Sequence, residues 1–389
     1  MAAIFLNIPS TISTLVTTAS MGYCFFCTWA GAQFGLKRKP LATAATDLPP
    51  VSILKPLKGT DPEMYYSLRS HCLQDYPQYE ILFAITDPND LAITVVERLM
   101  KDFPDRAIRL VRCEKMLGAN GKVSSLAQMT AIAKYDWLLV NDSDIRVEHD
   151  YLHRIVTELS APGVGLVTCL YRGIPARTLA SRLESLGIST DFCAGVLAAR
   201  QIEGGLRFGL GSTLALRRCD LESLGGFEAI ADYLADDYEL GRRIAEKNLQ
   251  VALSESVVET YLPAYTFAGF FSHQLRWART IRASRPAGYA GLLFTFTLPW
   301  ALLTLLPSRG AAWAWGIFVA AVLIRSMMAI VTARFVLRDK EVLRSFWLLP
   351  ARDILAVVVW LGGLAGQKIV WRGESFQLQE GKLKRERTS

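Results

Sequence analysis

The sequence predicts an α/β domain, built on a mostly parallel sheet with helices on both faces, together with N-terminal and C-terminal transmembrane helices. Two observations predict the α/β part. Short apolar runs alternate with helix-like segments between residues 51 and 141, and aspartates follow the ends of several runs. The membrane part is predicted by four long apolar stretches outside this region, at residues 11–34, 287–306, 311–333 and 346–366.

The alternating region is typical of repeated βα units. Its first strand covers residues 51–57, and Thr60, Asp61, Pro62 and Glu63 then give a helix start, with a proline in the first turn and acids near the positive end of the helix dipole. We expect further strands at 80–86, 107–112 and 137–141, and helices at 91–103 and 122–134. Ligands bind beyond the carboxyl ends of the strands in such sheets.

Two acidic motifs lie at that edge. Asp87 follows the second strand, where it fits either a turn or a ligand-binding residue. Asp142 and Asp144 follow the strand at 137–141, and two carboxylates one residue apart can bind the same Mg²⁺ or Mn²⁺ ion, although a solvated loop is the alternative.

Two further groups could complete such a site. Asp236 and Asp237 precede a predicted helix at 238–247, where they either cap the helix or leave one carboxylate poised as a base. Asn120 and Lys122 start another helix, and this segment either caps it or places the lysine near a nucleotide.

A basic and aromatic segment precedes the second apolar stretch. Four arginines recur at every third position, which is typical of an amphipathic helix on a membrane surface; they are Arg276, Arg279, Arg282 and Arg285. Arg276 could also reach a diphosphate, and Trp277 could form the wall of an acceptor pocket.

These groups suit transfer from a nucleotide sugar. A departing nucleoside diphosphate needs a cation and fixed positive donors, and an acceptor hydroxyl needs a carboxylate as base. The sequence therefore predicts sugar-nucleotide chemistry at a membrane.

Charge and composition favour the membrane over nucleic acid. The 389 residues are 51% hydrophobic and carry a net charge of +7, but the cations cluster beside apolar stretches, so we expect an anionic membrane surface as their partner and no nucleic acid. The basic residues 37–39 predict that everything after the first stretch is cytoplasmic.

Charged residues also lie inside the apolar stretches. Arg325 and the pair Arg352 and Asp353 are costly in lipid, so we expect them to face protein, to pair, or to lie near the interface. Whether the last stretch crosses the bilayer stays open.

The motifs together resemble the ceramide glucosyltransferase family of inverting GT-A-fold glycosyltransferases. The resemblance rests on residues 51–87, GANGKVSSL, NDSDIRV, the Asp-Asp-Tyr element and HxxRW, and it covers residues 50–285. It implies that Asp87 helps to hold the nucleotide, that Asp142 and Asp144 hold the diphosphate and metal, and that Asp237 is the general base. Arg276 and Trp277 match the family's final motif. The remaining substrate-binding candidates are Lys55, Lys122, Asp236, His273 and Gln274.

The acceptor stays open at this point. His273 departs from the Gln or Arg of the family pattern, and the segment around it is more similar to the bacterial hopanoid glycosyltransferases, so the resemblance allows ceramide with glucose or a hopanoid polyol with N-acetylglucosamine. We expect a multi-pass membrane enzyme with an anchor at 1–40, a catalytic domain at 41–285 and a membrane region with a basic tail at 286–389. It would use a UDP-sugar, a divalent cation and a membrane lipid acceptor. The alternatives are a processive polysaccharide synthase and a non-catalytic membrane binding protein.

Overall fold

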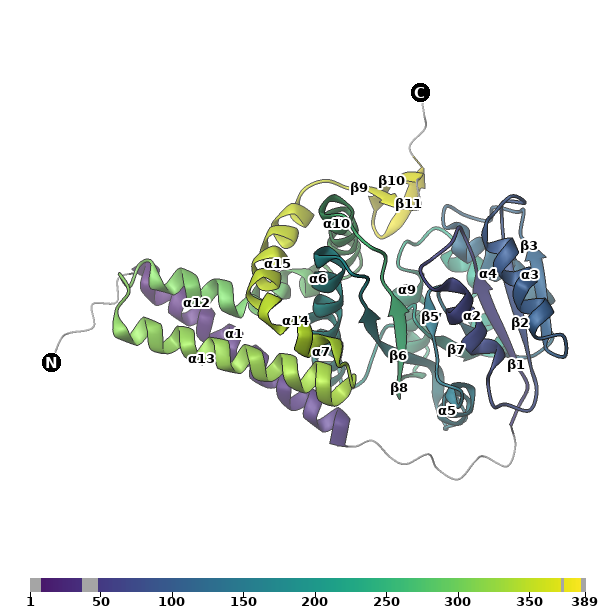
Figure 1. Cartoon of the computed structure of the whole chain (residues 1–389), viewed down its shortest axis with the longest axis horizontal. Helices are drawn as coiled ribbons and strands as arrows, with labels where there is room; N and C mark the ends of the chain where they lie inside the picture. Colours follow the sequence, from purple (N-terminus) through teal and green to yellow (C-terminus); the bar gives the residue numbers. More distant parts are fainter. Residues whose placement is uncertain (1–7, 37–47, 372–373, 386–389) are drawn as a thin grey trace. The chain divides into compact units, whose positions relative to one another are not determined.

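The computed structural model describes residues 8–36, 48–371 and 374–385 (Figure 1). The chain packs into two compact units, each assembled from separated segments. One, the helical unit, is drawn from Met1–Arg38, Arg177–Gln201 and Ala264–Gln367, and the other, the sheet unit, from Lys39–Ala176, Ile202–Pro263 and Lys368–Ser389. This division differs from the sequence-based boundaries, because residues 177–201 and 264–285 pack with the long apolar helices and the C-terminal residues pack with the sheet. The basic residues 37–39 lie outside the described residues.

The sheet unit contains an eight-stranded sheet in the order β3-β2-β1-β4-β7-β6-β8-β5. Its strands are β1 (Val51–Pro56), β2 (Tyr79–Ile85), β3 (Ala107–Arg112), β4 (Trp137–Val140), β5 (Ile145–Arg146), β6 (Val164–Ile174), β7 (Leu214–Arg217) and β8 (Gln250–Tyr261). Its helices are α2 (Met64–Cys72), α3 (Ala92–Asp102), α4 (Gly121–Ile132), α5 (Tyr151–Leu159), α8 (Arg218–Ser223), η2 (Phe227–Ile230) and α9 (Asp236–Glu246).

The first four strands of this order are parallel, and their register aligns their carboxyl ends. Ile53 of β1 pairs with Ile81 of β2 on one side and with Leu139 of β4 on the other. Beyond β4 the sheet becomes mixed, because β7 runs antiparallel to both β4 and β6, while β6 and β8 are parallel to each other. The predicted mostly parallel α/β fold is confirmed, and the strands and helices predicted between residues 80 and 141 lie within about two residues of their expected positions. The first helix begins later than expected: α2 starts at Met64, so Pro62 precedes it and its first turn contains no acidic residue.

Continuous apolar runs explain why these strands lie in the centre of the sheet. Residues 51–55 of β1 and every residue of β2 are buried, as expected for strands covered by helices on both faces. Helix α3 buries one stripe, with Ala92, Val96 and Leu99 inside, because these residues recur at the three- and four-residue spacing of one helix face.

The helical unit begins with α1 and ends with α15. Its elements are α1 (Ile8–Leu36), α6 (Leu179–Gly187), η1 (Ile188–Phe192), α7 (Cys193–Ile202), α10 (Phe267–Ser284), α11 (Pro286–Gly291), η3 (Leu292–Thr295), α12 (Thr297–Leu305), α13 (Ala312–Ile330), η4 (Val331–Val336), α14 (Glu341–Ser345), η5 (Phe346–Leu348) and α15 (Leu349–Leu364). The segments η1 and η4 are π-helical, and each continues an α-helix.

Helix α1 packs along α12 and α13, as the purple and green ribbons show (Figure 1). The contact is partly polar: the Thr17 hydroxyl lies 3.1 Å from the Thr304 hydroxyl, and the Cys24 sulfur lies 3.1 Å from Thr297 Oγ1. Hydroxyls of this kind hold helices together in apolar surroundings. Thr17 and the other serines and threonines of α1 also lower the hydropathy of this helix.

Two described helical stretches are long and apolar enough to cross a membrane, Ala312–Val336 and Glu341–Leu364. A third candidate is the pair Pro286–Thr295 and Thr297–Leu305, which is bent by 53°. These correspond to the three apolar stretches expected near the C-terminus. Helix α1 is not among the described helices that meet this test, so a membrane-spanning role for α1 stays a prediction.

The last described residues form a small antiparallel sheet instead of a basic tail. It consists of β9 (Lys368–Trp371), β10 (Glu374–Gln379) and β11 (Lys382–Arg385). Backbone hydrogen bonds attach it to the turn at residues 231–234: Leu383 N donates to Asp232 O at 2.7 Å, and Leu234 N donates to Gly381 O at 3.2 Å. The C-terminal sheet therefore supports the segment that leads into α9.

Candidate active site

The acidic motif after β4 rests on a buried polar network. Asn141 is fully buried, and its amide donates to the Tyr151 hydroxyl at 2.9 Å and to Ser212 O at 2.7 Å. Its carbonyl oxygen lies 3.2 Å from His71 Nε2. Because every contact of this amide is internal, the turn that carries Asp142 and Asp144 has a fixed geometry.

Lys55 supports the same turn from inside the protein. Its side chain is fully buried in β1, and Nζ donates to Asp142 O at 3.1 Å and lies 3.3 Å from His71 Nε2. Burial lowers the pKa of Lys55 to about 7, while Asp144 and Asp142 oppose that shift. We expected Lys55 to bind substrate, but its contacts indicate that it orients the backbone of the acidic motif.

Lys122 joins two of the predicted acidic motifs. The Asn120 side chain caps α4 by accepting from Val123 N at 3.2 Å, which places Lys122 in the first turn of that helix. Its Nζ lies 2.8 Å from Asp142 Oδ1 and 3.1 Å from Asp236 Oδ2. Burial acts to lower the pKa of Lys122, but attraction to the aspartates is stronger in sum and raises it. Both alternatives left open by the sequence therefore hold: Asn120 is a helix cap, and Lys122 reaches the acidic edge.

Asp237 lies at the start of α9 with both carboxylate oxygens fixed. Oδ2 accepts from Gly211 N at 2.7 Å, and Oδ1 accepts from Tyr238 N at 2.8 Å. Burial and the neighbouring Asp236 raise the pKa of Asp237 to about 6, while Lys122 opposes this shift. A carboxylate with a pKa near neutrality is a stronger proton acceptor than an ordinary aspartate, which suits a general base.

Gly211 is a site residue that the sequence did not reveal. A Cβ atom at this position would lie 2.9 Å from Asp142 Oδ2 and 3.4 Å from Asp237 Oδ2. Both carboxylates therefore border the same small space, and only glycine leaves it open. The two glycines of the run GLGST, just before β7, were the available signal.

Asp144 is held by the strand β8. Its Oδ2 accepts from the Thr260 hydroxyl at 2.6 Å, and burial together with the charge of Asp142 raises the pKa of Asp144 to about 6. The side chain of Asp142 stays 42% exposed and can therefore reach a ligand. Two carboxylates that repel each other in this way fit a divalent cation, which prefers oxygen ligands. In the part of the chain that the structure describes, no three His, Cys, Asp or Glu side chains gather into a complete metal site.

Asp87 lies two residues beyond β2, at the same edge of the sheet. Its Oδ1 accepts from Asn89 N at 2.9 Å, which closes a local turn, and the residue is exposed. Among the described residues, no hydrogen bond or ion pair joins Asp87 to Lys122 or its partners. The carboxylate is free to meet a ligand from solvent, so its nucleotide-binding role stays a prediction.

His273 and Gln274 belong to the helical unit, on α10. Both contact one carboxylate that the sequence did not single out: His273 Nδ1 lies 3.2 Å from Glu184 Oε1, and Gln274 Nε2 donates to Glu184 Oε2 at 2.7 Å. Gln274 is only 8% exposed. Internal contacts therefore account for Gln274, which we had expected to bind substrate.

Arg276 and Trp277 follow on the same helix and are partly buried. The Trp277 ring lies 5.3 Å from the His273 ring and 5.7 Å from the Phe192 ring, measured between centroids. Further along α10, Arg279 donates to Ala365 O, and Arg282 donates to Leu364 O and Gly366 O. These arginines satisfy carbonyls at the end of α15, as cations commonly do at helix C-termini, so the basic repeat serves helix packing in addition to any surface role.

Known proteins resemble this chain in sequence and in fold. Ceramide glucosyltransferase 1 of Caenorhabditis elegans is 26% identical over 240 residues, which cover 61% of this chain and 51% of that protein. The ceramide glucosyltransferase of Komagataella phaffii is 37% identical over 114 residues, or 28% of this chain and 22% of that protein. The chain thus spans about half the length of the first of these relatives, and none of the relatives named here supports the hopanoid alternative.

The fold has a counterpart among solved structures. A mannosyltransferase from Pyrobaculum calidifontis, solved in complex with GDP-Man and Mn2+, matches with a TM-score of 0.55 and 22% sequence identity, covering 91% of this chain and 99% of that one. This likeness confirms the GT-A-like fold. The sequence model described as "Glycosyl transferase family 21" matches residues 12–384, and we conclude that the chain belongs to this family.

Proposed function

We propose that this chain transfers a single sugar from a UDP-sugar to a hydroxyl of a membrane lipid, with glucose as the sugar and a ceramide as the lipid. The observation that carries the proposal is the group formed by Lys122, Asp142, Asp236 and Asp237, in which one cation joins two acidic motifs beside a carboxylate of raised pKa. The names of the relatives support the choice of donor sugar and acceptor.

The proposed reaction is one displacement at the anomeric carbon. Asp237 accepts the proton of the acceptor hydroxyl as that oxygen attacks, and the UDP leaves from the opposite face, so the configuration inverts and no covalent enzyme intermediate forms. Lys122 lies at the acidic edge, where it can stabilise the charge of the departing diphosphate. By resemblance to the family's final motif, Arg276 is assigned to the same leaving group and Trp277 to the acceptor.

A divalent cation fits the acidic motif and is part of the proposal. Asp142 and Asp144 would hold it, and when bound it neutralises charge on the diphosphate. The Mn2+ in the solved mannosyltransferase supports this assignment.

The test is transfer by purified full-length protein in lipid nanodiscs. UDP-glucose or UDP-N-acetylglucosamine would be offered with a ceramide or a hopanoid polyol, and the lipids would be analysed by mass spectrometry. We expect one hexose added to the ceramide and no product when the cation is chelated. Polymer would indicate a processive synthase, and no transfer from either donor would refute the proposed function.

A further inference from the structure

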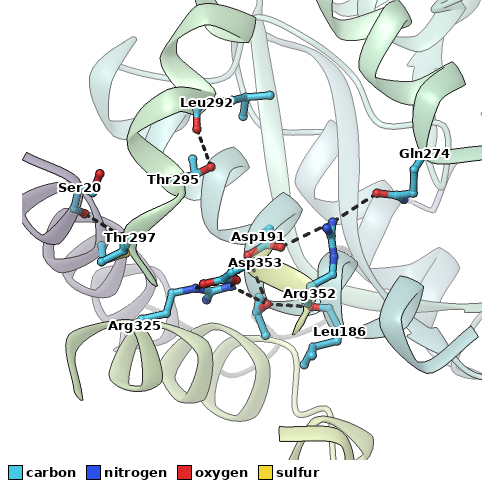
Figure 2. A network of polar contacts seen from close by, with 12 residues as sticks. Ser20, Leu186, Asp191, Gln274, Leu292, Thr295, Thr297, Arg325, Arg352 and Asp353 are labelled. Atoms are coloured by element: carbon cyan, nitrogen blue, oxygen red, sulfur yellow. Dashed lines mark hydrogen bonds and ion pairs between the residues drawn. The ribbon is translucent and has the colours of Figure 1, made fainter. Parts of the chain in front are cut away.

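The helical unit contains a largely buried network of charged and amide side chains that the proposed reaction does not use (Figure 2). Its members come from α6, η1, α10, α13 and α15, and they are Glu184, Asp191, Gln274, Arg325, Arg352 and Asp353. Arg325 and Asp353 were expected to pair or to face protein, and both expectations are confirmed. The connection to α10 was not foreseen.

The network is anchored between the two apolar helices α13 and α15. Arg325 Nη2 lies 2.8 Å from Asp353 Oδ1, and Arg325 Nε donates to Asp353 Oδ2 at 3.0 Å. The same guanidinium donates to Asp191 Oδ1, and its side chain is only 1% exposed. The two apolar helices are thereby tied to the π-helical turn η1.

Arg352 extends the network from η1 to α10. Its Nη2 lies 3.6 Å from Asp191 Oδ2 and donates to Gln274 Oε1 at 3.3 Å. The guanidinium also lies against Gly187, at the end of α6, where an added Cβ atom would overlap it. Charge on one side and the bare backbone of Gly187 on the other therefore fix the position of Arg352.

Both ends of the Gln274 side-chain amide are hydrogen-bonded. The carbonyl oxygen accepts from Arg352, and the amide nitrogen donates to Glu184 Oε2. If the amide turned over, its NH2 group would face a guanidinium and its oxygen would face a carboxylate, so only one orientation satisfies both partners. A buried side chain that is hydrogen-bonded at both ends in this way resists rotation of α10 about its own axis.

That rotation matters because α10 also carries Arg276 and Trp277. Gln274 and Trp277 are three residues apart and therefore lie close together on the helix surface. The π-helical turn contributes as well, since Asp191 joins the network while its neighbour Phe192 contacts the Trp277 ring. Turns of this type occur frequently at functional sites.

A contribution to the stability of the fold does not by itself explain these buried charges. Charges in apolar helices are costly, and well-packed apolar residues in place of a buried ion pair are often neutral or stabilising. We propose that Arg352 is a positioning residue, which holds α10 through Gln274 so that Arg276 and Trp277 keep the orientation needed for sugar transfer. The proposal rests on the proposed function, but the orientation of Trp277 can be measured without it.

The first test compares two glycines that both lie in helices of this unit. Gly187→Ala pushes a methyl group into the Arg352 guanidinium, whereas Gly195→Ala on α7 brings a Cβ atom no closer than 3.9 Å, to the Tyr23 hydroxyl. Both changes add the same helix propensity. We expect Gly187→Ala to lower kcat about 10-fold to 100-fold with the KM for UDP-sugar unchanged, since a small misplacement of a catalytic group has effects of that size. Gly195→Ala should match wild type.

The second test exchanges the amide of Gln274 and the carboxylate of Glu184. Gln274→Glu places two carboxylates face to face and should lower kcat, while Glu184→Gln added to it restores a donor for the new carboxylate and should recover most of the rate. A role in stability alone would not produce this recovery in kcat among variants compared as equal amounts of folded protein.

The orientation of Trp277 itself can be followed by ¹⁹F NMR of protein labelled with fluorotryptophan. The resonance that disappears in Trp277→Phe is the one that belongs to Trp277. We expect that resonance to move in Gly187→Ala and in Gln274→Glu, and to return in the double variant. A Trp277 resonance and a kcat that stay at wild-type values in both single variants would overturn the proposal. Wild-type protein without transfer would refute the proposed function, and the NMR result would still decide the positioning role.

Discussion

Asp237 meets the chemical requirements of a base, because burial and Asp236 raise its pKa to about 6 while two backbone N–H groups fix its oxygens. We expect Asp237→Asn to lower kcat about 10²-fold to 10⁴-fold, the range of general base catalysis. An asparagine offers one acceptor oxygen for two N–H donors, so we also expect a loss of about 1–3 kcal/mol in the free energy of unfolding. Kinetics and thermal unfolding of the same samples measure both.

The control for this variant is Asp105→Asn, an exposed aspartate of the sheet unit. It should keep wild-type turnover and stability. Binding of UDP to Asp237→Asn should stay close to wild type, and turnover near the wild-type value would remove Asp237 from the role of base.

In the proposed mechanism, the charge of Lys122 shifts the pH at which Asp237 can act as a base. For a base with a pKa near 6, kcat/KM should be full above that pH and should fall as the pH decreases through about 6, because the carboxylate becomes protonated. Lys122 lowers the pKa of Asp237, so Lys122→Gln should move this acid limb to higher pH. The exposed Lys115→Gln is the matched control, and identical pH profiles for both variants would contradict this electrostatic role.

Two residues missed from the sequence, Gly211 and Glu184, and the unexpected backbone contact of Lys55 share a physical cause. All three act through contacts with chain segments far away in sequence, and no local pattern reports such contacts. The places of Asp142 and Asp237 in the fold could be predicted, because each lies at the boundary of a strand or helix, which hydrophobic periodicity reveals.

At the scale of elements, the C-terminal sheet holds the turn before α9. Asp232 and Tyr233 lie between two supports: Asn120 Nδ2 donates to Tyr233 O at 2.8 Å, and Leu383 N donates to Asp232 O at 2.7 Å. The turn leads directly into Asp236 and Asp237, so its position sets theirs.

Removing one donor tests this support. Leu383→Pro deletes the N–H that bonds Asp232, and we expect turnover to fall about tenfold or more because the aspartates shift. Leu383→Ala keeps the N–H and loses the same side-chain packing, so it separates the two effects. Equal kcat values for the two variants would show that the hydrogen bond has no role in catalysis.

The elements that could be predicted are those with a strong local signal. The strands β1, β2 and β4 were evident because a central parallel strand is apolar at nearly every position. The sheet β9 to β11 lacked such a signal, since alternating charges such as Lys382 and Lys384 resemble a basic tail until the strands pair with each other.

At the scale of the whole molecule, two described helical stretches are apolar enough to cross a membrane, Ala312–Val336 and Glu341–Leu364. We expect the full-length protein to stay in the membrane pellet after an alkaline carbonate wash, which releases proteins held only by surface charge. Release into the supernatant would contradict a spanning role for these helices. The cytoplasmic location of the sheet unit stays a prediction, because it rests on residues 37–39.

The division into two units could not be predicted from the sequence, for the same reason as the missed contacts. Residues 177–201 and 368–385 each pack with segments that are far from them in sequence, and no local pattern indicates that packing. The family itself could be recognised because its motifs are short, ordered and local.

The anomeric configuration of the product tests the proposed reaction most directly. Purified protein would be supplied with UDP-α-glucose and ceramide, and the newly formed glycolipid would be examined by ¹H NMR before it can be modified further. A single displacement assisted by Asp237 predicts a ceramide that carries one β-linked glucose, formed by wild-type protein and nearly absent with Asp237→Asn. An α-linked product, or a β-linked product formed at the wild-type rate by Asp237→Asn, would contradict the mechanism.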